Sequence, residues 1–146
     1  MKKIFMTFGL LALMPAVFGA QHAADGGLIL EKRQADTVMT IINVDLGEDE
    51  TIISAKGKNG VYGTVYITYR LSYHADGKSG FATGSGLGAI DADTVMFGRS
   101  SGIWTRDGSI ITIRQLVQVS DGIQNLDTID IDMRKDTFVL KAYALQ

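Results

Sequence analysis

Histidine and aspartate are the residue types of this chain that could bind a metal ion. Its two histidines, His22 and His74, are far apart in the sequence and it has no cysteine, so no zinc-ligand set is present. Four aspartates in the C-terminal part lack the glycine and the terminal glutamate of a calcium-binding loop. We expect no metal and interpret these aspartates as a solvated strand edge: Asp127, Asp130, Asp132 and Asp136.

The glycine repeat Gly84-x-Gly86-x-Gly88 resembles a phosphate-binding loop only in composition. A phosphate loop requires a following Lys-Ser or Lys-Thr and a helix, and the sequence after Gly88 shows neither. We therefore expect no nucleotide and no other cofactor.

A set of four residues combines aromatic walls with hydrogen-bonding tips and falls on the predicted inner face of the fold. Buried tyrosine, tryptophan and glutamine need polar partners, and apolar binding sites use a few such groups to orient a ligand. A core in which these groups satisfy one another is the alternative. The candidate ligand-binding residues are Tyr69, Tyr73, Trp104 and Gln115.

The elements that would position these residues are hairpins. Polar and apolar residues alternate from Leu28 onward, which is typical of strands, and Asp-Gly pairs are strong turn signals. A two-residue loop at Asp76-Gly77 makes every large residue of one strand face a small one of the next, as a small closed barrel requires. The predicted partners are Tyr73 with Gly80, Leu71 with Ala82, Tyr69 with Gly84, Ile67 with Gly86 and Val65 with Gly88. We expect Gly86→Val to overpack this interior.

Two further hairpins and two N-terminal strands, 31–45 and 51–56, bring the total to about eight strands. The loops are expected at Asp107-Gly108 and at 134–137. The predicted partners are Trp104 with Ile111, Ile131 with Leu140, Ile129 with Ala142 and, on the outer face, Asp130 with Lys141.

The N-terminus has the order of a secretory signal peptide. Lys2 and Lys3 precede an apolar run, 4–18, that ends in Gly19 and Ala20. The run is short for a membrane-spanning helix, although an uncleaved anchor is an alternative. We predict a signal peptide at 1–20, a single domain at 21–146, and a secreted or periplasmic protein.

Composition limits the partners. Without Lys2 and Lys3 the chain has 12 basic and 16 acidic residues, a net charge of about −4. Such a domain lacks the basic footprint of a nucleic-acid-binding protein and the basic amphipathic stretch of a membrane-surface protein. We expect neither nucleic acid nor a membrane as a partner after signal cleavage.

Three segments in the middle of the chain resemble the allene oxide cyclase barrel and the related dirigent proteins: Tyr69–Gly84, Asp93–Trp104 and Ile113–Val117. Gly98-Arg99-Ser100-Ser101-Gly102-Ile103-Trp104 is similar to the glycine-rich strand of those families, with Arg99 and Ser101 as departures. The resemblance covers about a third of the chain. It implies an eight-stranded barrel with an apolar lumen, often trimeric, and oily or phenolic substrates. It carries over no catalytic residue; Glu31, at the start of a strand, is the only candidate.

We thus predict an all-β fold, an antiparallel up-and-down (calycin-like) barrel of about eight strands, with a sandwich as the alternative. The leading functional hypothesis is binding of a small apolar or phenolic molecule in the lumen. An isomerase or cyclase on an oily substrate is the second, and a buried acid with a raised pKa in the cavity would favour it. The third is an interaction module with a filled barrel that works through an outer face: Tyr62, Tyr66, Arg70 and His74.

Overall fold

The computed structural model of the protein describes residues 30–145. The predicted signal peptide, its cleavage site and His22 lie outside the described residues. Within residues 30–145, no helix is long and apolar enough to cross a membrane.

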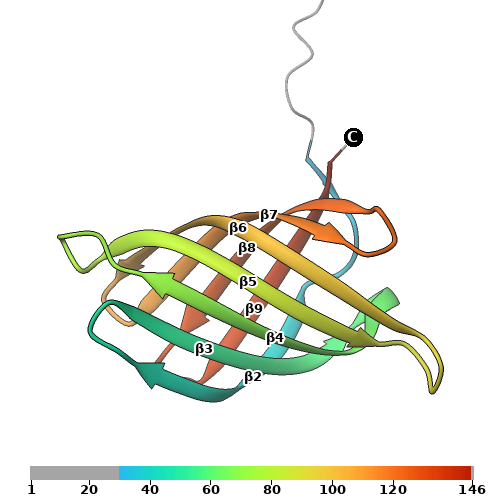
Figure 1. The fold of residues 1–146 in the computed structure, drawn as a ribbon, viewed down its shortest axis with the longest axis horizontal. Helices are drawn as coiled ribbons and strands as arrows, with labels where there is room; N and C mark the ends of the chain where they lie inside the picture. Colours follow the sequence, from blue (N-terminus) through green and yellow to red (C-terminus); the bar gives the residue numbers. More distant parts are fainter. Residues whose placement is uncertain (1–29, 146) are drawn as a thin grey trace, which may run out of the picture.

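Eight antiparallel strands close into a barrel, which confirms the predicted fold (Figure 1). Each strand pairs with the next one in sequence, and β9 pairs with both β8 and β2, so the sandwich alternative is wrong. A short additional strand, β1 (Glu31–Lys32), pairs with the last residues of β9. The barrel strands are β2 (Thr37–Leu46), β3 (Glu50–Asn59), β4 (Gly63–Ser72), β5 (Ser79–Ala89), β6 (Val95–Asp107), β7 (Ile110–Val119), β8 (Gln124–Asp132) and β9 (Thr137–Ala144).

Period-two alternation decides which side chains face the lumen. In β4, Tyr69 and Leu71 are buried whereas Tyr66 and Arg70 are exposed, because successive side chains of a strand point to opposite faces. Six large side chains of the interior are fully buried: Ile53, Leu71, Ile113, Ile129, Ile131 and Phe138.

The predicted register of β4 and β5 is confirmed: Ile67 faces Gly86 and Tyr69 faces Gly84. The loop between them is longer than the two residues expected. The Asp76 carboxylate accepts hydrogen bonds from two backbone N–H groups, those of Lys78 and Ser79, at 2.8 and 3.0 Å. The Asp-Gly pair therefore lies inside a wider turn that is centred as predicted.

The other two predicted registers are wrong by two residues. In the β6–β7 hairpin the loop is Gly108–Ser109, with Gly108 at φ +57°; glycine in this first position fits the geometry of a type II′ turn. In the β8–β9 hairpin the loop spans 133–136. A shift of two residues leaves every side chain on its predicted face. The observed partners are Trp104 with Ile113, Ile129 with Leu140 and Ile131 with Phe138.

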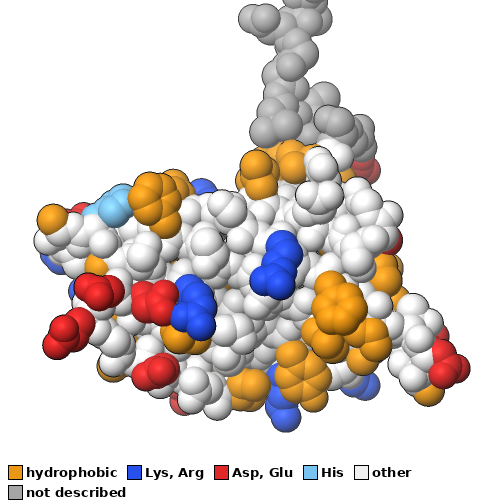
Figure 2. All heavy atoms as spheres, viewed as in Figure 1, with side chains coloured by type: hydrophobic (Ala, Val, Ile, Leu, Met, Phe, Trp, Pro, Cys, Tyr) orange, Lys and Arg blue, Asp and Glu red, His pale blue; other side chains and the backbone are white. Residues whose placement is uncertain are grey.

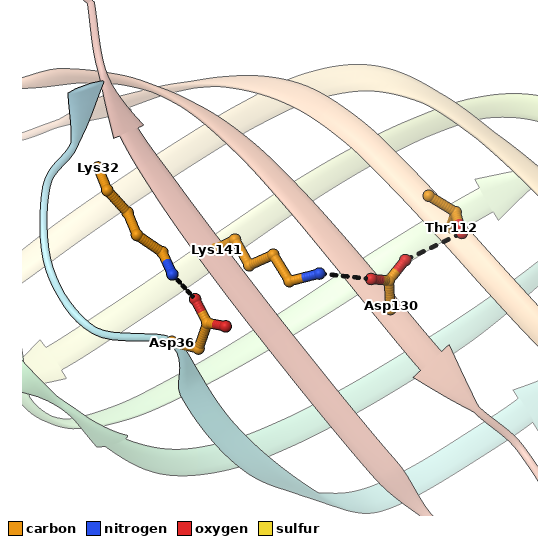
Figure 3. Close-up of polar contacts among 5 residues, drawn as sticks. All are labelled: Lys32, Asp36, Thr112, Asp130 and Lys141. Carbon is orange, nitrogen blue, oxygen red and sulfur yellow. Dashed lines mark hydrogen bonds and ion pairs between the residues drawn. The ribbon is translucent and has the colours of Figure 1, made fainter. Parts of the chain in front are cut away.

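The predicted contact between Asp130 and Lys141 forms on the outer face despite this shift (Figure 3). Lys141 Nζ lies 3.0 Å from Asp130 Oδ2, and the Thr112 hydroxyl donates to Asp130 Oδ1 at 3.0 Å. The Lys141 backbone is opposite Thr128, so its long side chain reaches Asp130 diagonally.

The predicted strand over 31–45 is interrupted at 33–36, between β1 and β2. An ion pair joins the two ends of the interruption, with Lys32 Nζ 2.7 Å from Asp36 Oδ1 (Figure 3). The interruption releases Arg33 and Gln34 from the strand and places both among the residues that line the barrel cavity.

Candidate functional site

A cavity lies in the lumen, where β4 begins and β7 ends. The space open to the centre of a water-sized sphere is about 80 Å³, several times the ~10–15 Å³ that one water requires. A lumen that retains such space is not a filled barrel. Four strands form its apolar wall. The residues are Val65 and Ile67 on β4, Met96 on β6, Val117 and Val119 on β7, and Leu140 and Ala142 on β9.

Two glycines that face each other across β5 and β6 border this space. A Cβ added at Gly86 would lie 3.6 Å from its nearest neighbour, and one at Gly98 would lie 3.9 Å away. Both are ordinary contact distances. A Cβ at Gly84, by contrast, would overlap the Ser100 hydroxyl, its nearest neighbour, and would lie 2.5 Å from Tyr69 Cε1. The crowding that we expected at Gly86 is therefore found at Gly84, where the partner is the large Tyr69 ring rather than Ile67.

The polar end of the cavity is built around Gln115, Tyr69 and Asp127. Gln115 Nε2 donates to the Tyr69 hydroxyl at 2.8 Å, and both side chains are 2% exposed. Asp127 on β8 stands directly opposite Gln115 on β7 and is 5% exposed. The Tyr69 ring is stacked on the Phe138 ring, with 6.0 Å between the two ring centroids. This packing fixes the position of the Tyr69 side chain.

Four buried polar atoms have no hydrogen-bond partner among the described residues, and all four belong to residues that line this cavity. Buried polar atoms are paired in the great majority of cases, so their convergence on one space marks it as the site. The atoms are Gln34 Oε1, Tyr62 Oη, Gln115 Oε1 and Asp127 Oδ1.

Burial raises the pKa values of three acidic side chains at the polar end of the cavity. It raises the pKa of Asp127 from 3.8 to about 7, partly opposed by the positive charge of Arg33. Burial also raises the pKa of Tyr69, and the Asp127 charge adds to that effect. For Tyr62, burial and then the Asp121 charge raise the pKa. Asp127 is thus a carboxyl group that can exchange a proton near neutral pH.

Two hydrogen bonds hold the chain segments that close this end. The Arg33 Nε–H donates to Asn125 Oδ1, and Gln34 Nε2 donates to Asn59 Oδ1. Asn59 leads into the short 3₁₀ turn η1 (Gly60–Tyr62), which supplies Tyr62. The strand interruption and the 3₁₀ turn are therefore linked over the cavity.

The four predicted ligand-binding residues separate into two pairs. Tyr69 and Gln115 line the cavity, whereas Tyr73 and Trp104 border a second hollow toward the other end of β4. There Trp104 Nε1 donates to the Ser72 carbonyl at 2.8 Å, and its ring meets Tyr73 edge to face. The second hollow is larger, about 290 Å³, but it contains none of the four unpartnered atoms. We therefore centre the site on Tyr69 and Gln115.

Sequence reasoning missed Asp127, Tyr62 and Arg33. The interpretation of Asp127 as part of a solvated edge is wrong, since it alternates with buried Ile129 and faces the lumen. That alternation was a usable signal. Tyr62 was assigned to the outer face, but its hydroxyl is buried at the cavity. No periodic pattern marks Arg33, because it lies in the interruption between two strands.

The remaining candidates lie elsewhere. Glu31 has an exposed side chain on β1 and is not among the cavity residues. His74 is an exposed turn residue, 3.3 Å from the Ser79 hydroxyl and packed edge to face on Phe81. Among residues 30–145, no group of three or more His, Asp or Glu side chains could hold a metal ion.

An exposed apolar row crosses three strands on the outer surface of the described residues. Tyr66, Leu87 and Phe97 are neighbours across β4, β5 and β6 and are all exposed, Tyr66 by 48%. Figure 2 shows hydrophobic side chains gathered on this face of the molecule. Arg70, also predicted for an outer contact face, is paired with Glu50 at 2.5 Å.

Comparison of the chain with protein-family models, curated proteins and solved structures finds no match. The resemblance to allene oxide cyclases and dirigent proteins therefore stays a prediction from the sequence.

Proposed function

We propose that this protein is an exported β-barrel that binds a small apolar or phenolic molecule in the cavity beside Asp127. The observation that carries the proposal is the convergence of four unpartnered buried polar atoms on one hollow. Leaving such an atom unsatisfied costs about 1–3 kcal/mol, and a core without a ligand-binding role gains nothing from placing four of them together. Apolar walls with a few converging polar groups are the common construction of small-molecule sites.

Filling the cavity tests the proposal. We expect the wild-type protein to retain a small molecule in native mass spectrometry, and Gly86→Val to lose it, because the added side chain enters the space beside Gly98. Thr83→Val is the matched control, since it lies on the outward face of the same strand. No bound mass in any preparation, together with no binding of oily alcohols, acids or phenols, would contradict the proposal.

A second candidate function is an isomerase or cyclase that uses the same cavity. Asp127 favours it, because a buried carboxyl group with a pKa of about 7 suits general acid–base catalysis at neutral pH. If this candidate is right, Asp127→Asn abolishes conversion of a molecule that the variant still binds. Unchanged turnover in Asp127→Asn would remove this candidate and leave the binding protein.

A further inference from the structure

Three of the four unpartnered buried atoms at the polar end of the cavity are hydrogen-bond acceptors. The amide nitrogens of Gln115 and Gln34 each donate one hydrogen bond, to Tyr69 and to Asn59, and both amide oxygens have no partner among the described residues. Asp127 Oδ1 is a third such acceptor, and an ionised carboxylate has no donor to offer. Only the Tyr62 hydroxyl adds a donor to this set of unpartnered atoms. A ligand that satisfies the three unpartnered oxygens must bring hydrogen-bond donors of its own.

The acceptors are close enough to share one ligand group. Asp127 and Gln115 are direct cross-strand partners that both face the lumen, and side chains so placed have Cβ atoms about 4.5–5.5 Å apart. Asp127 also interacts electrostatically with Tyr62, Tyr69 and Arg33. Asp127 and Gln115 are therefore placed to contact one ligand group, and Gly86 and Gly98 line the apolar part of the same cavity.

Charge decides between ligands of similar size. A ligand carboxylate would bring a second negative charge beside Asp127, which like-charge repulsion disfavours. Arg33 only partly offsets this cost, because burial raises the pKa of Asp127 to about 7 although the positive charge of Arg33 opposes the rise. A neutral hydroxyl donates to Asp127 without this repulsion and can accept from Tyr62.

We propose that the cavity selects apolar molecules whose polar group is an alcohol and discriminates against carboxylates, through the acceptors of Asp127 and Gln115. This inference rests on the proposed function and names its ligand class. A hydrogen bond to a charged group corresponds to a preference of about 10- to 100-fold. An ether of the same length, which lacks the donor, should lose that preference.

Three probes of equal length test the selection in full-length protein: octan-1-ol, heptyl methyl ether and octanoate, titrated calorimetrically at pH 8, where Asp127 is largely ionised. We expect octanol to bind about 10- to 100-fold more tightly than the ether, and octanoate to bind most weakly. In Asp127→Asn, whose fold is checked by thermal melting, the alcohol preference should shrink and octanoate should gain affinity.

The outcomes separate the two proposals. Equal binding of all three probes, or tighter binding of octanoate, would overturn the alcohol selection and leave the lumen as a binding site. An unchanged ranking in folded Asp127→Asn would overturn the role of Asp127. Absence of binding by every probe, with no retained molecule in native mass spectrometry, would instead overturn the proposed function. If Asp127→Asn does not fold, the ranking in the wild-type protein decides the selection.

Discussion

Replacing Asp127 by asparagine should change how the stability of the protein depends on pH. Burial raises the pKa of this carboxyl group from 3.8 to about 7. Between these values the folded state keeps a proton that the unfolded state has released. The stability that this proton provides is therefore present at about pH 4 and is lost as the pH rises through 7.

The magnitude follows from the shift. The two pKa values differ by about three units, and each unit corresponds to ~1.36 kcal/mol. The Asp127 contribution to the free energy of unfolding should thus fall by about 4 kcal/mol between pH 4 and pH 8. Asparagine has nearly the same shape but does not titrate, so Asp127→Asn should lack this loss.

Urea unfolding at several pH values measures the effect as the difference between wild type and Asp127→Asn, which removes the contributions of the other carboxyl groups. Asp91→Asn is the control. Backbone hydrogen bonds from Asp93 and a side-chain bond from Thr94 lower the pKa of Asp91, so its contribution is lost as the pH falls. Parallel stability curves for wild type and Asp127→Asn would refute the burial of Asp127 as the cause of its raised pKa.

Three further outcomes are expected. Gly84→Ala should lower the melting temperature, because its Cβ has no space beside the β4 ring it faces, whereas Gly86→Ala should leave it unchanged or raise it; equal melting temperatures would contradict this difference. Trp104→Phe should cost about 1–3 kcal/mol, because the Ser72 carbonyl loses its donor, without weakening octanol binding in the other cavity; weaker binding would contradict the separation of the two hollows. Sequencing of exported material should give a mature N-terminus near residue 20 or 21, and an intact Met1 in the membrane fraction would contradict export.

The sequence was sufficient for most of the strands and for the faces of most of their residues, but not for every register. Alternation alone places Tyr69 and Gln115 inside, and both are buried. A turn signal such as Asp107-Gly108 does not say which two residues form the loop. The loop is Gly108–Ser109, and the resulting shift of two residues exchanges cross-strand partners without exchanging faces.

The missed parts of the site depend on features without a period. Arg33 and Tyr62 reach the cavity from a strand interruption and a 3₁₀ turn, whose positions follow from barrel closure rather than from a local pattern. The prediction of a solvated position for Asp127 was wrong for a different reason. Its alternation with Ile129 pointed inward, but charged residues are mostly exposed, and we gave that tendency more weight than the pattern.

The glycine repeat shows why a cavity forms at one position and not at its neighbour. Gly84 and Gly86 are both on the inner face of β5, but the partner of Gly84 on β4 is the large Tyr69, whose ring occupies the space that the glycine leaves. Gly86 faces Gly98 on β6 and the smaller Ile67 on β4, so the space there stays open. Two facing glycines lower stability relative to larger strand residues, and a buried carboxyl group such as Asp127 lowers it further. Their occurrence at one cavity is the pattern expected where binding, rather than stability, determines the residues.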